Sequence, residues 1–105
     1  MTPGNPTAVK DNAAFMAGKL KLMSHPERLV MLCRMDESEV SVKELVELSG
    51  LSQSSVSQHL ALLRDSGVVT ARGAAQTRYY SLTDHATRII IAALCDVCGT
   101  ENPMV

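Results

Sequence analysis

The stretch that decides the fold runs from Ser41 to Val69 and reads SVKELVELSGLSQSSVSQHLALLRDSGVV. Ser41 is followed three residues later by Glu44, a capping box that predicts the start of a helix. Gly50 interrupts the pattern after about two turns, as the tight turn between two packed helices requires. Ser52 is suited to cap a second helix. The apolar stripe of the first helix is expected to comprise Val42, Leu45 and Leu48.

The second predicted helix has two contrasting faces. Its apolar face repeats at i, i+4 and i+7 and comprises Val56, Leu60 and Leu63. Its other face is uncharged and comprises Ser54, Ser55, Gln58 and Ala61. A face that meets only water normally carries Lys and Glu, whereas a helix that enters a DNA major groove needs short donors and acceptors, with Gln suited to adenine. The pattern therefore favours a helix-turn-helix that reads DNA.

Two strands are predicted directly after these helices. Gly67 stands in the usual position for the end of a helix. Residues 68–72 and 77–82 are rich in Val, Thr and Tyr and predict strands, which residues 73–76 join as a hairpin. A helix-turn-helix followed at once by a hairpin is the winged-helix order. The alternative, a small helical domain with an incidental hairpin, is disfavoured because the local signals agree in order.

The expected DNA-binding surface combines the second helix with the hairpin. Arg72 and Arg78 flank the predicted hairpin tip, from which they could reach phosphates or the minor groove. The residues expected to contact double-stranded operator DNA are Ser52, Gln53, Ser54, Ser55, Ser57, Gln58, His59, Arg64, Arg72, Gln76, Thr77 and Arg78.

The N-terminal part is expected to form a tail and two further helices. Residues 1–7 contain two prolines and a glycine and are predicted to be disordered. Residues 8–23 have a helical pattern, with Ala13, Met16, Leu20 and Met23 on one face. Ser24 and Glu27 form a second capping box, which predicts a helix that ends before an acidic loop at residues 36–39.

The C-terminal part is expected to form the last helix. Asp84 or the residue before it is suited to cap this helix, which should end near Cys98. Residues 89–94 are apolar on nearly every side, so the helix must be buried all round, and its simplest partner is its copy in a second subunit. Residues 99–105 are predicted to be disordered, which leaves 8–98 as one winged-helix DNA-binding and dimerisation domain of a homodimer. The expected class is mainly α with a small β-hairpin, in the order α-α-α-α-β-β-α.

The composition fits one small domain. The chain has 105 residues and 46% hydrophobic residues, which excludes a disordered chain. No apolar run approaches the length of a membrane span, and no signal-peptide pattern is present, so we expect a cytoplasmic protein without a membrane partner. The formal net charge is −1, but residues 52–82 carry three Arg against one Asp. Few phosphate contacts per subunit would make a single subunit bind weakly, and a dimer doubles them.

Two segments of the chain resemble a known family. The pattern Ser-Gln-Ser-Ser-Val-Ser-Gln-His-Leu-x-x-Leu-Arg-x-x-Gly-Val-Val, residues 52–69, resembles the recognition helix of the arsenic-repressor (ArsR) family of winged-helix repressors. Residues 22–29, Leu-Met-Ser-His-Pro-Glu-Arg-Leu, resemble that family's second helix. The match covers roughly residues 14–98. The resemblance implies a homodimeric DNA-binding repressor that an inducer releases.

Cys33, Cys95 and Cys98 are the residues best suited to chemistry. Their odd number and the expected cytoplasmic location argue against a structural disulfide framework. Cys95 and Cys98 are three residues apart, so they can share one helix face as a redox pair, as half of a zinc site or by chance. Each Cys could also be a small core residue. The absence of a second Cys-x-x-Cys and of His-x-x-x-His excludes a zinc finger.

The resemblance narrows the choice of inducer. The family's Cys-x-Cys metal site has no counterpart in residues 44–48, and its last-helix zinc site would keep Asp84 but lacks the expected His ligands, His85 lying one residue off. The branch that senses persulfides and polysulfides pairs a Cys in the second helix with one near the end of the last helix. Cys33 and Cys98 match those places, which makes Cys95 auxiliary. The alternative inducer is arsenite or a soft metal held by Cys33, Cys95 and Cys98.

The sequence does not favour an enzyme. No nucleophile motif and no Gly-rich phosphate loop is present. We therefore expect neither a catalytic residue nor a cofactor. A dimerising interaction module without DNA binding is the third class considered.

Overall fold

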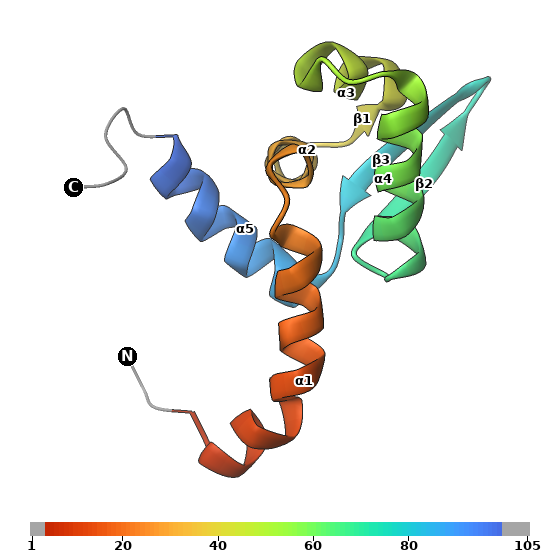
Figure 1. Cartoon of the computed structure of the whole chain (residues 1–105). Helices are drawn as coiled ribbons and strands as arrows, with labels where there is room; N and C mark the ends of the chain where they lie inside the picture. The colour runs from red at the N-terminus through yellow and green to blue at the C-terminus, as the bar shows by residue number, and fades with distance from the viewer. Residues whose placement is uncertain (1–3, 100–105) are drawn as a thin grey trace.

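The computed structural model describes residues 4–99 and has the predicted class, five helices with a small antiparallel sheet. The elements, in chain order, are α1 (Pro6–Met23), α2 (Pro26–Glu37), β1 (Val40–Ser41), α3 (Val42–Ser49), α4 (Gln53–Asp65), β2 (Val69–Ala74), β3 (Thr77–Leu82) and α5 (His85–Cys98). Helix α2 lies at the centre, with α3, α4 and the sheet on one side and α5 on the other, while α1 extends away (Figure 1). The winged-helix order is confirmed.

Strand β1 was not predicted. Its two residues pair with β3, Val40 opposite Tyr80 and Ser41 opposite Tyr79, so the sheet has the order β1-β3-β2. A strand this short carries no alternation in its sequence, and only its long-range partner defines it. The predicted acidic loop at 36–39 is also too long, because α2 continues to Glu37.

The hairpin is tighter than predicted. Strand β2 continues to Ala74, which pairs with Thr77, so Gly73 belongs to the ladder and only two residues form the turn. The first of these, Ala75, has φ 56°. Two-residue hairpin turns require this left-handed backbone to match the strand twist. The turn was not predicted because Ala75 stands where such turns usually carry Gly or Asn.

The helix-turn-helix forms as predicted. The Ser41 hydroxyl accepts a hydrogen bond from the Glu44 backbone N–H while the Glu44 carboxylate accepts from the Ser41 N–H. Gly50 ends α3 with φ 72°, and Ser52 caps α4. Helix α4 closes in a Schellman motif, in which the N–H of Gly67 (φ 76°) donates to Arg64 and that of Val68 to Leu63. In the predicted stripe of α3, Leu45 is buried but Leu48 is 51% exposed.

The start of α2 differs from the prediction. Ser24 ends α1 instead of capping α2, and its hydroxyl donates to the Lys21 carbonyl. His25 precedes α2 and makes no side-chain cap hydrogen bond, and Pro26 occupies the first turn of the helix, where proline is well tolerated. Helix α1 begins at Pro6, where the Asn5 side chain accepts from two backbone N–H groups, so the predicted tail at 1–7 is too long. Residues 1–3 and 100–105, parts of the two predicted tails, lie outside the described residues.

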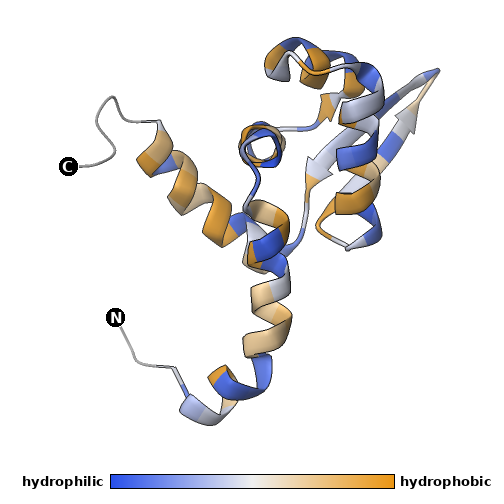
Figure 2. Ribbon diagram, in the orientation of Figure 1, coloured by the Kyte–Doolittle hydropathy of each residue, from blue (hydrophilic) through white to orange (hydrophobic). Residues whose placement is uncertain are grey.

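One hydrophobic core joins α2, α3, α4, the sheet and a single face of α5. Its fully buried members include Met31, Leu32, Met35, Val40, Leu45, Val56, Leu60, Leu63, Val68, Val69 and Ile91. Helix α5 is not buried all round in the single chain, because Ile89 is 58% exposed while Thr87 and Ile91 face inward. Hydrophobic residues make up much of α5 and the middle of α1, the two elements that extend from the core (Figure 2).

A charged contact joins the two extending helices. The Lys19 ammonium of α1 donates to both oxygens of Asp84, at 2.8 and 2.7 Å. Asp84 also caps α5, accepting from the backbone N–H and the hydroxyl of Thr87. These hydrogen bonds, that from Lys19 first, lower the Asp84 pKa to about 2. None of the helices within residues 4–99 is long and apolar enough to cross a membrane.

Candidate nucleic-acid interface and thiol pair

Helix α4 presents the polar face expected of a DNA-reading helix. The exposed members of the predicted contact set on this helix and at its cap are Ser52, Gln53, Ser54, Ser57, Gln58 and Arg64. Ser55 and His59 are partly buried. The side chain of Ser52 caps the helix by accepting from the Ser55 N–H. Gln53, Ser54, Ser57 and Gln58 are therefore the side chains with the greatest freedom to meet base edges.

His59 turns from this face toward the start of α2. Its ring meets that of His25 edge to face, with centroids 4.9 Å apart. Burial, followed by the nearby charges of His25 and Arg28, lowers the His59 pKa, against an opposing effect of Glu27. His25 Nδ1 approaches Glu27 Oε2 at 2.7 Å without hydrogen-bond geometry. The contact places His59 at a packing junction, not on the open polar face.

The two wing arginines lie on opposite faces of the hairpin. Arg78 pairs with Gly73 and Arg72 with Tyr79, which are successive positions of the ladder, so their side chains alternate. The face of Arg78 is continuous with that of Tyr80 and Leu82, which are buried against the helices. Arg72 lies on the outer face. Gln76 and Thr77 are exposed at the tip, between the two arginines.

Arg72 has a partner that the sequence did not reveal. Its Nε donates to Glu39 Oε2 at 3.0 Å and its Nη2 to the other carboxylate oxygen. These hydrogen bonds lower the Glu39 pKa and raise that of Arg72. The two residues are 33 positions apart, and they meet because β1 and β2 flank the same strand. The unpredicted strand β1 is what brings Glu39 to the wing.

The structure corrects the predicted thiol pair. A disulfide joins Cys33 of α2 to Cys95 of α5, with Cα atoms 6.0 Å apart, while Cys98 is free and exposed. Cys95 lies one turn beyond Ile91, the buried residue of α5 that packs in the core. Cys98 is the last residue of α5, three positions beyond Cys95, and it is exposed. Cys95 is therefore the disulfide partner of Cys33 in this structure, while the roles of the three cysteines in sensing stay a prediction.

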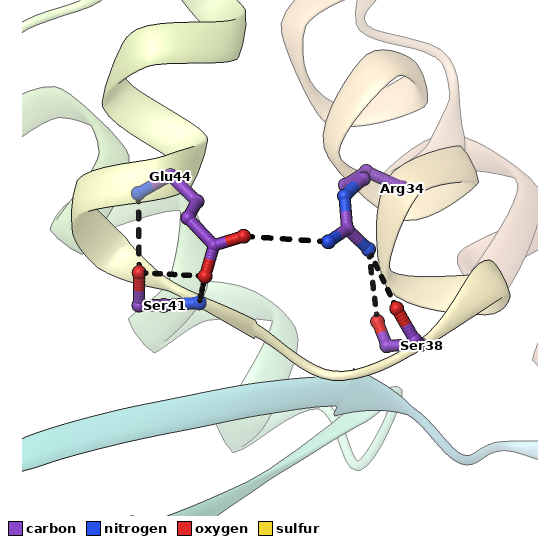
Figure 3. Close-up of polar contacts among 4 residues, drawn as sticks. All are labelled: Arg34, Ser38, Ser41 and Glu44. Carbon is purple, nitrogen blue, oxygen red and sulfur yellow. Dashed lines mark hydrogen bonds and ion pairs between the residues drawn. The ribbon is translucent and has the colours of Figure 1, made fainter.

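Arg34 follows Cys33 but serves another contact. Its guanidinium donates to the carbonyl and hydroxyl of Ser38 and, at 3.4 Å, to Glu44 of the capping box (Figure 3). It therefore ties the end of α2 to the start of α3. Helix α2 is held covalently to α5 on one side and by this polar contact to the helix-turn-helix on the other.

A three-thiol metal site is not assembled. Within residues 4–99 no group of three or more His, Cys, Asp or Glu side chains is placed to hold a metal ion. Asp84, the one familiar metal-site residue that the sequence retained, is engaged by Lys19 and Thr87. The arsenite or soft-metal alternative would therefore need the Cys33–Cys95 disulfide to be reduced and Cys98 to move toward the two thiols so formed.

Comparison with known proteins identifies the family. Residues 25–71 match the model of the bacterial regulatory protein, arsR family. The chain is 39% identical over 100 residues to the nodulation protein NolR of Rhizobium meliloti, covering 95% of this chain and 82% of that protein. It is 45% identical over 82 residues to the transcriptional regulator YgaV of Escherichia coli, covering 77% and 83%. The crystal structure of the repressor BigR from Xylella fastidiosa superposes with a TM-score of 0.82 at 34% identity, covering 90% of this chain and 96% of that one. The chain thus belongs to the ArsR family and is a DNA-binding transcriptional regulator.

Proposed function

We propose that this regulator is a homodimeric repressor, and that linking Cys33 to Cys95 releases it from its operator. The observation that carries the proposal is the disulfide between α2 and α5. ArsR-family regulators bind operator DNA and typically dimerise. Family membership thus supplies the DNA-binding activity, and the cysteine placement supplies a means to control it.

The DNA-binding half of the proposal rests on α4 and the wing. The uncharged face at Gln53, Ser54, Ser57 and Gln58 would enter the major groove, with Arg78 at the wing near the backbone. In a two-fold dimer the two α4 helices would read half-sites about one helical turn apart.

The dimer half rests on the bare apolar faces of the two extending helices. The exposed residues that would be covered include Val9, Phe15 and Leu20 of α1 and Ile89 of α5. The Lys19–Asp84 contact fixes α1 relative to α5, so the two helices can present one surface to a second copy. In that arrangement α5 belongs to the dimer interface, and α2 moves together with the helix-turn-helix and the wing, which would contact DNA.

The switch would act through α2. Oxidation removes two protons and two electrons from Cys33 and Cys95 as their sulfurs join, and a polysulfide or a peroxide would accept the electrons. The link fastens α2 to the dimer helix, and the Arg34 contact transmits the position of α2 to α3. Affinity would fall because two reading heads must match the fixed DNA repeat.

The Cα separation bears on the inducer. At 6.0 Å it lies within the range of a direct disulfide, so added sulfur atoms are not required to close the link. Polysulfide and peroxide are therefore both competent oxidants, and the geometry does not select between them. Arsenite is the weaker candidate, because Cys98 is exposed and unpaired with the other two thiols.

The test combines DNA binding with bond mapping, using DNA from the chain's own promoter region. Wild-type protein should leave DNA after polysulfide treatment, as should Cys98→Ser, whereas Cys33→Ser and Cys95→Ser should stay bound. Gln58→Ala, which should weaken binding without oxidant, controls for the DNA contact. A Cys95→Ser protein that still responds, together with an unresponsive Cys98→Ser protein, would contradict the proposed pair.

Digestion with trypsin and an Asp-specific protease identifies the bond directly. Cleavage after Arg28, Arg34 and Arg88 and before Asp96 places the three cysteines on peptides 29–34, 89–95 and 96–105. The proposed link joins the first two peptides. Each sulfur atom added in a polysulfide bridge would raise the mass of the linked peptides by about 32 Da. Bound arsenic would instead support the three-thiol alternative.

A further inference from the structure

Glu39 holds the outer-face arginine of the wing in a closed arrangement. The Arg72 guanidinium uses Nε and Nη2 to grip both oxygens of Glu39 and lies 5.3 Å from the centroid of the Tyr79 ring. Within residues 4–99 no other carboxylate pairs with a wing arginine, and Arg78 has no ion-pair partner. The two wing arginines thus differ in availability as well as in direction.

The paired hydrogen bonds from Arg72 to the Glu39 carboxylate have the same arrangement as those an arginine makes to a phosphate. A guanidinium presents parallel N–H groups that match two oxygens of a carboxylate or of a phosphate equally well. The side chains of Arg72 and Glu39 are 57% and 42% exposed, so DNA could reach this pair without disturbing the core. A DNA phosphate would therefore compete with Glu39 for the same donors.

We propose that Glu39 is an intramolecular substitute for a DNA phosphate, which withholds Arg72 from the backbone and leaves Arg78 to supply the wing's charge. This inference rests on the proposed contact between the wing and DNA. Because a phosphate contact carries no sequence information, withholding one lowers the affinity for any DNA. Glu39 would thereby reduce retention on random sequence, while the base contacts of α4 still define the operator.

The inference predicts a change in salt dependence that can be measured on a random-sequence duplex. The slope of log affinity against log salt is about −0.9 for each phosphate contacted. Glu39→Gln keeps the shape of the side chain but removes its charge, so Arg72 should be freed. The slope should steepen by about 0.9 per subunit, and affinity at low salt should rise several-fold.

Three further variants complete the design. Asp36→Asn removes one charge from a comparable ion pair, Asp36 with Arg88, which lies between α2 and α5 instead of at the wing. It should raise affinity less and leave the slope unchanged. Arg72→Ala should bind much like wild type, because its guanidinium is already occupied, and in the double variant Glu39→Gln with Arg72→Ala the gain should vanish.

The outcomes separate this inference from the function on which it rests. If Glu39→Gln and Asp36→Asn behave alike, or if Arg72→Ala alone flattens the slope by one contact, the role of Glu39 is refuted while DNA binding by the wing stands. If wild-type protein shows no salt-dependent binding, or if Arg78→Ala leaves that binding unaltered, the wing assignment fails and the inference with it. Thermal melting of each variant confirms that the fold is intact.

Discussion

The central unit, residues 40–82, and the two outer helices, α1 and α5, solve the burial problem differently. Each helix of the central unit buries an apolar face within the same chain, as Leu45 does in α3 and Leu60 in α4. The outer helices instead leave large apolar side chains bare, including Phe15 at 67% exposed and Ile89 at 58%. The core of the central unit is thus filled within one subunit, although Leu48 and Leu62 stay exposed on its surface, whereas the outer helices present a bare surface that a second copy would cover. In a regulator divided in this way, the central unit can change its position relative to the dimer surface without changing its own fold.

The largest effect should come from the core of the central unit. Leu60→Ala deletes a side chain that is 1% exposed and should lower the free energy of unfolding by about 2–5 kcal/mol. Leu62→Ala, on the same helix at 42% exposed, should cost within about 0.5 kcal/mol. Urea unfolding followed by circular dichroism compares them. Equal losses would show that α4 is not packed through the predicted face.

Substitutions on the exposed faces of α1 and α5 should weaken association of the dimer instead of destabilising the fold. Phe15→Glu and Ile89→Glu place charge on the bare faces of α1 and α5 and should weaken the dimer at least about tenfold, or 1.4 kcal/mol. Leu48→Glu, at a residue that is 51% exposed on α3, is the matched control and should leave the dimer unchanged. Sedimentation over a concentration series measures all three. A dimer sensitive only to Leu48→Glu would move the interface to the central unit.

A smaller effect is expected where α1 meets α5. Asp84→Asn keeps a helix-capping side chain but loses the charge that Lys19 grips, at a cost of about 1 kcal/mol, whereas Asp84→Ala should lose the cap as well. The Asp84 pKa is lowered to about 2 from 3.8, so the stabilisation is present above pH 3.8 and is lost as the pH falls toward 2. Chemical unfolding at pH 7 and at pH 2 should show Asp84→Asn approaching wild type at the lower pH, whereas Asp84→Ala should remain less stable because it still lacks the cap.

The smallest effect concerns His59 at the edge of the central unit. Because its pKa is lowered from 6.5, its neutral form favours the fold. This contribution is complete above pH 6.5 and disappears as the pH falls through the lowered pKa. Melting temperatures of wild type and His59→Asn should therefore differ less at acid pH than at pH 7.5. His85→Asn, at an exposed residue of α5, is the control, and an identical pH profile for the two variants would contradict the account.

Local sequence signals predicted most of the central unit, but they did not predict the features that depend on contacts between distant parts of the chain. The capping box at Ser41, the turn at Gly50 and the stripe through Leu60 are each contained within one or two helical turns, so they were visible in sequence. Ser24 carries the same capping pattern but ends α1, because the hydroxyl found a carbonyl one turn back. Strand β1 and its neighbour Glu39 depend on partners in β2 and β3, which no local pattern reveals.

Long-range packing also explains why Cys33 is bonded to Cys95 and not, as the sequence had led us to expect, to Cys98. Both positions are available on a helix drawn from sequence alone, since they are three residues apart. What distinguishes them is how far α5 stays against α2, and this is set by tertiary packing around Ile91.

The Cys33–Cys95 bond also closes the chain into a ring. The two cysteines are 62 positions apart, and the enclosed segment contains the whole central unit, from β1 through α4 to β3. Closing a loop of this length restricts the unfolded chain and stabilises the folded one by about 4 kcal/mol in the chain-entropy description. The state proposed to leave DNA is then the sturdier one, and the state that occupies the operator is the more exposed to unfolding and degradation. DNA, by binding only the folded reduced protein, would offset part of that difference, so unbound reduced subunits would be the shortest-lived form of the regulator.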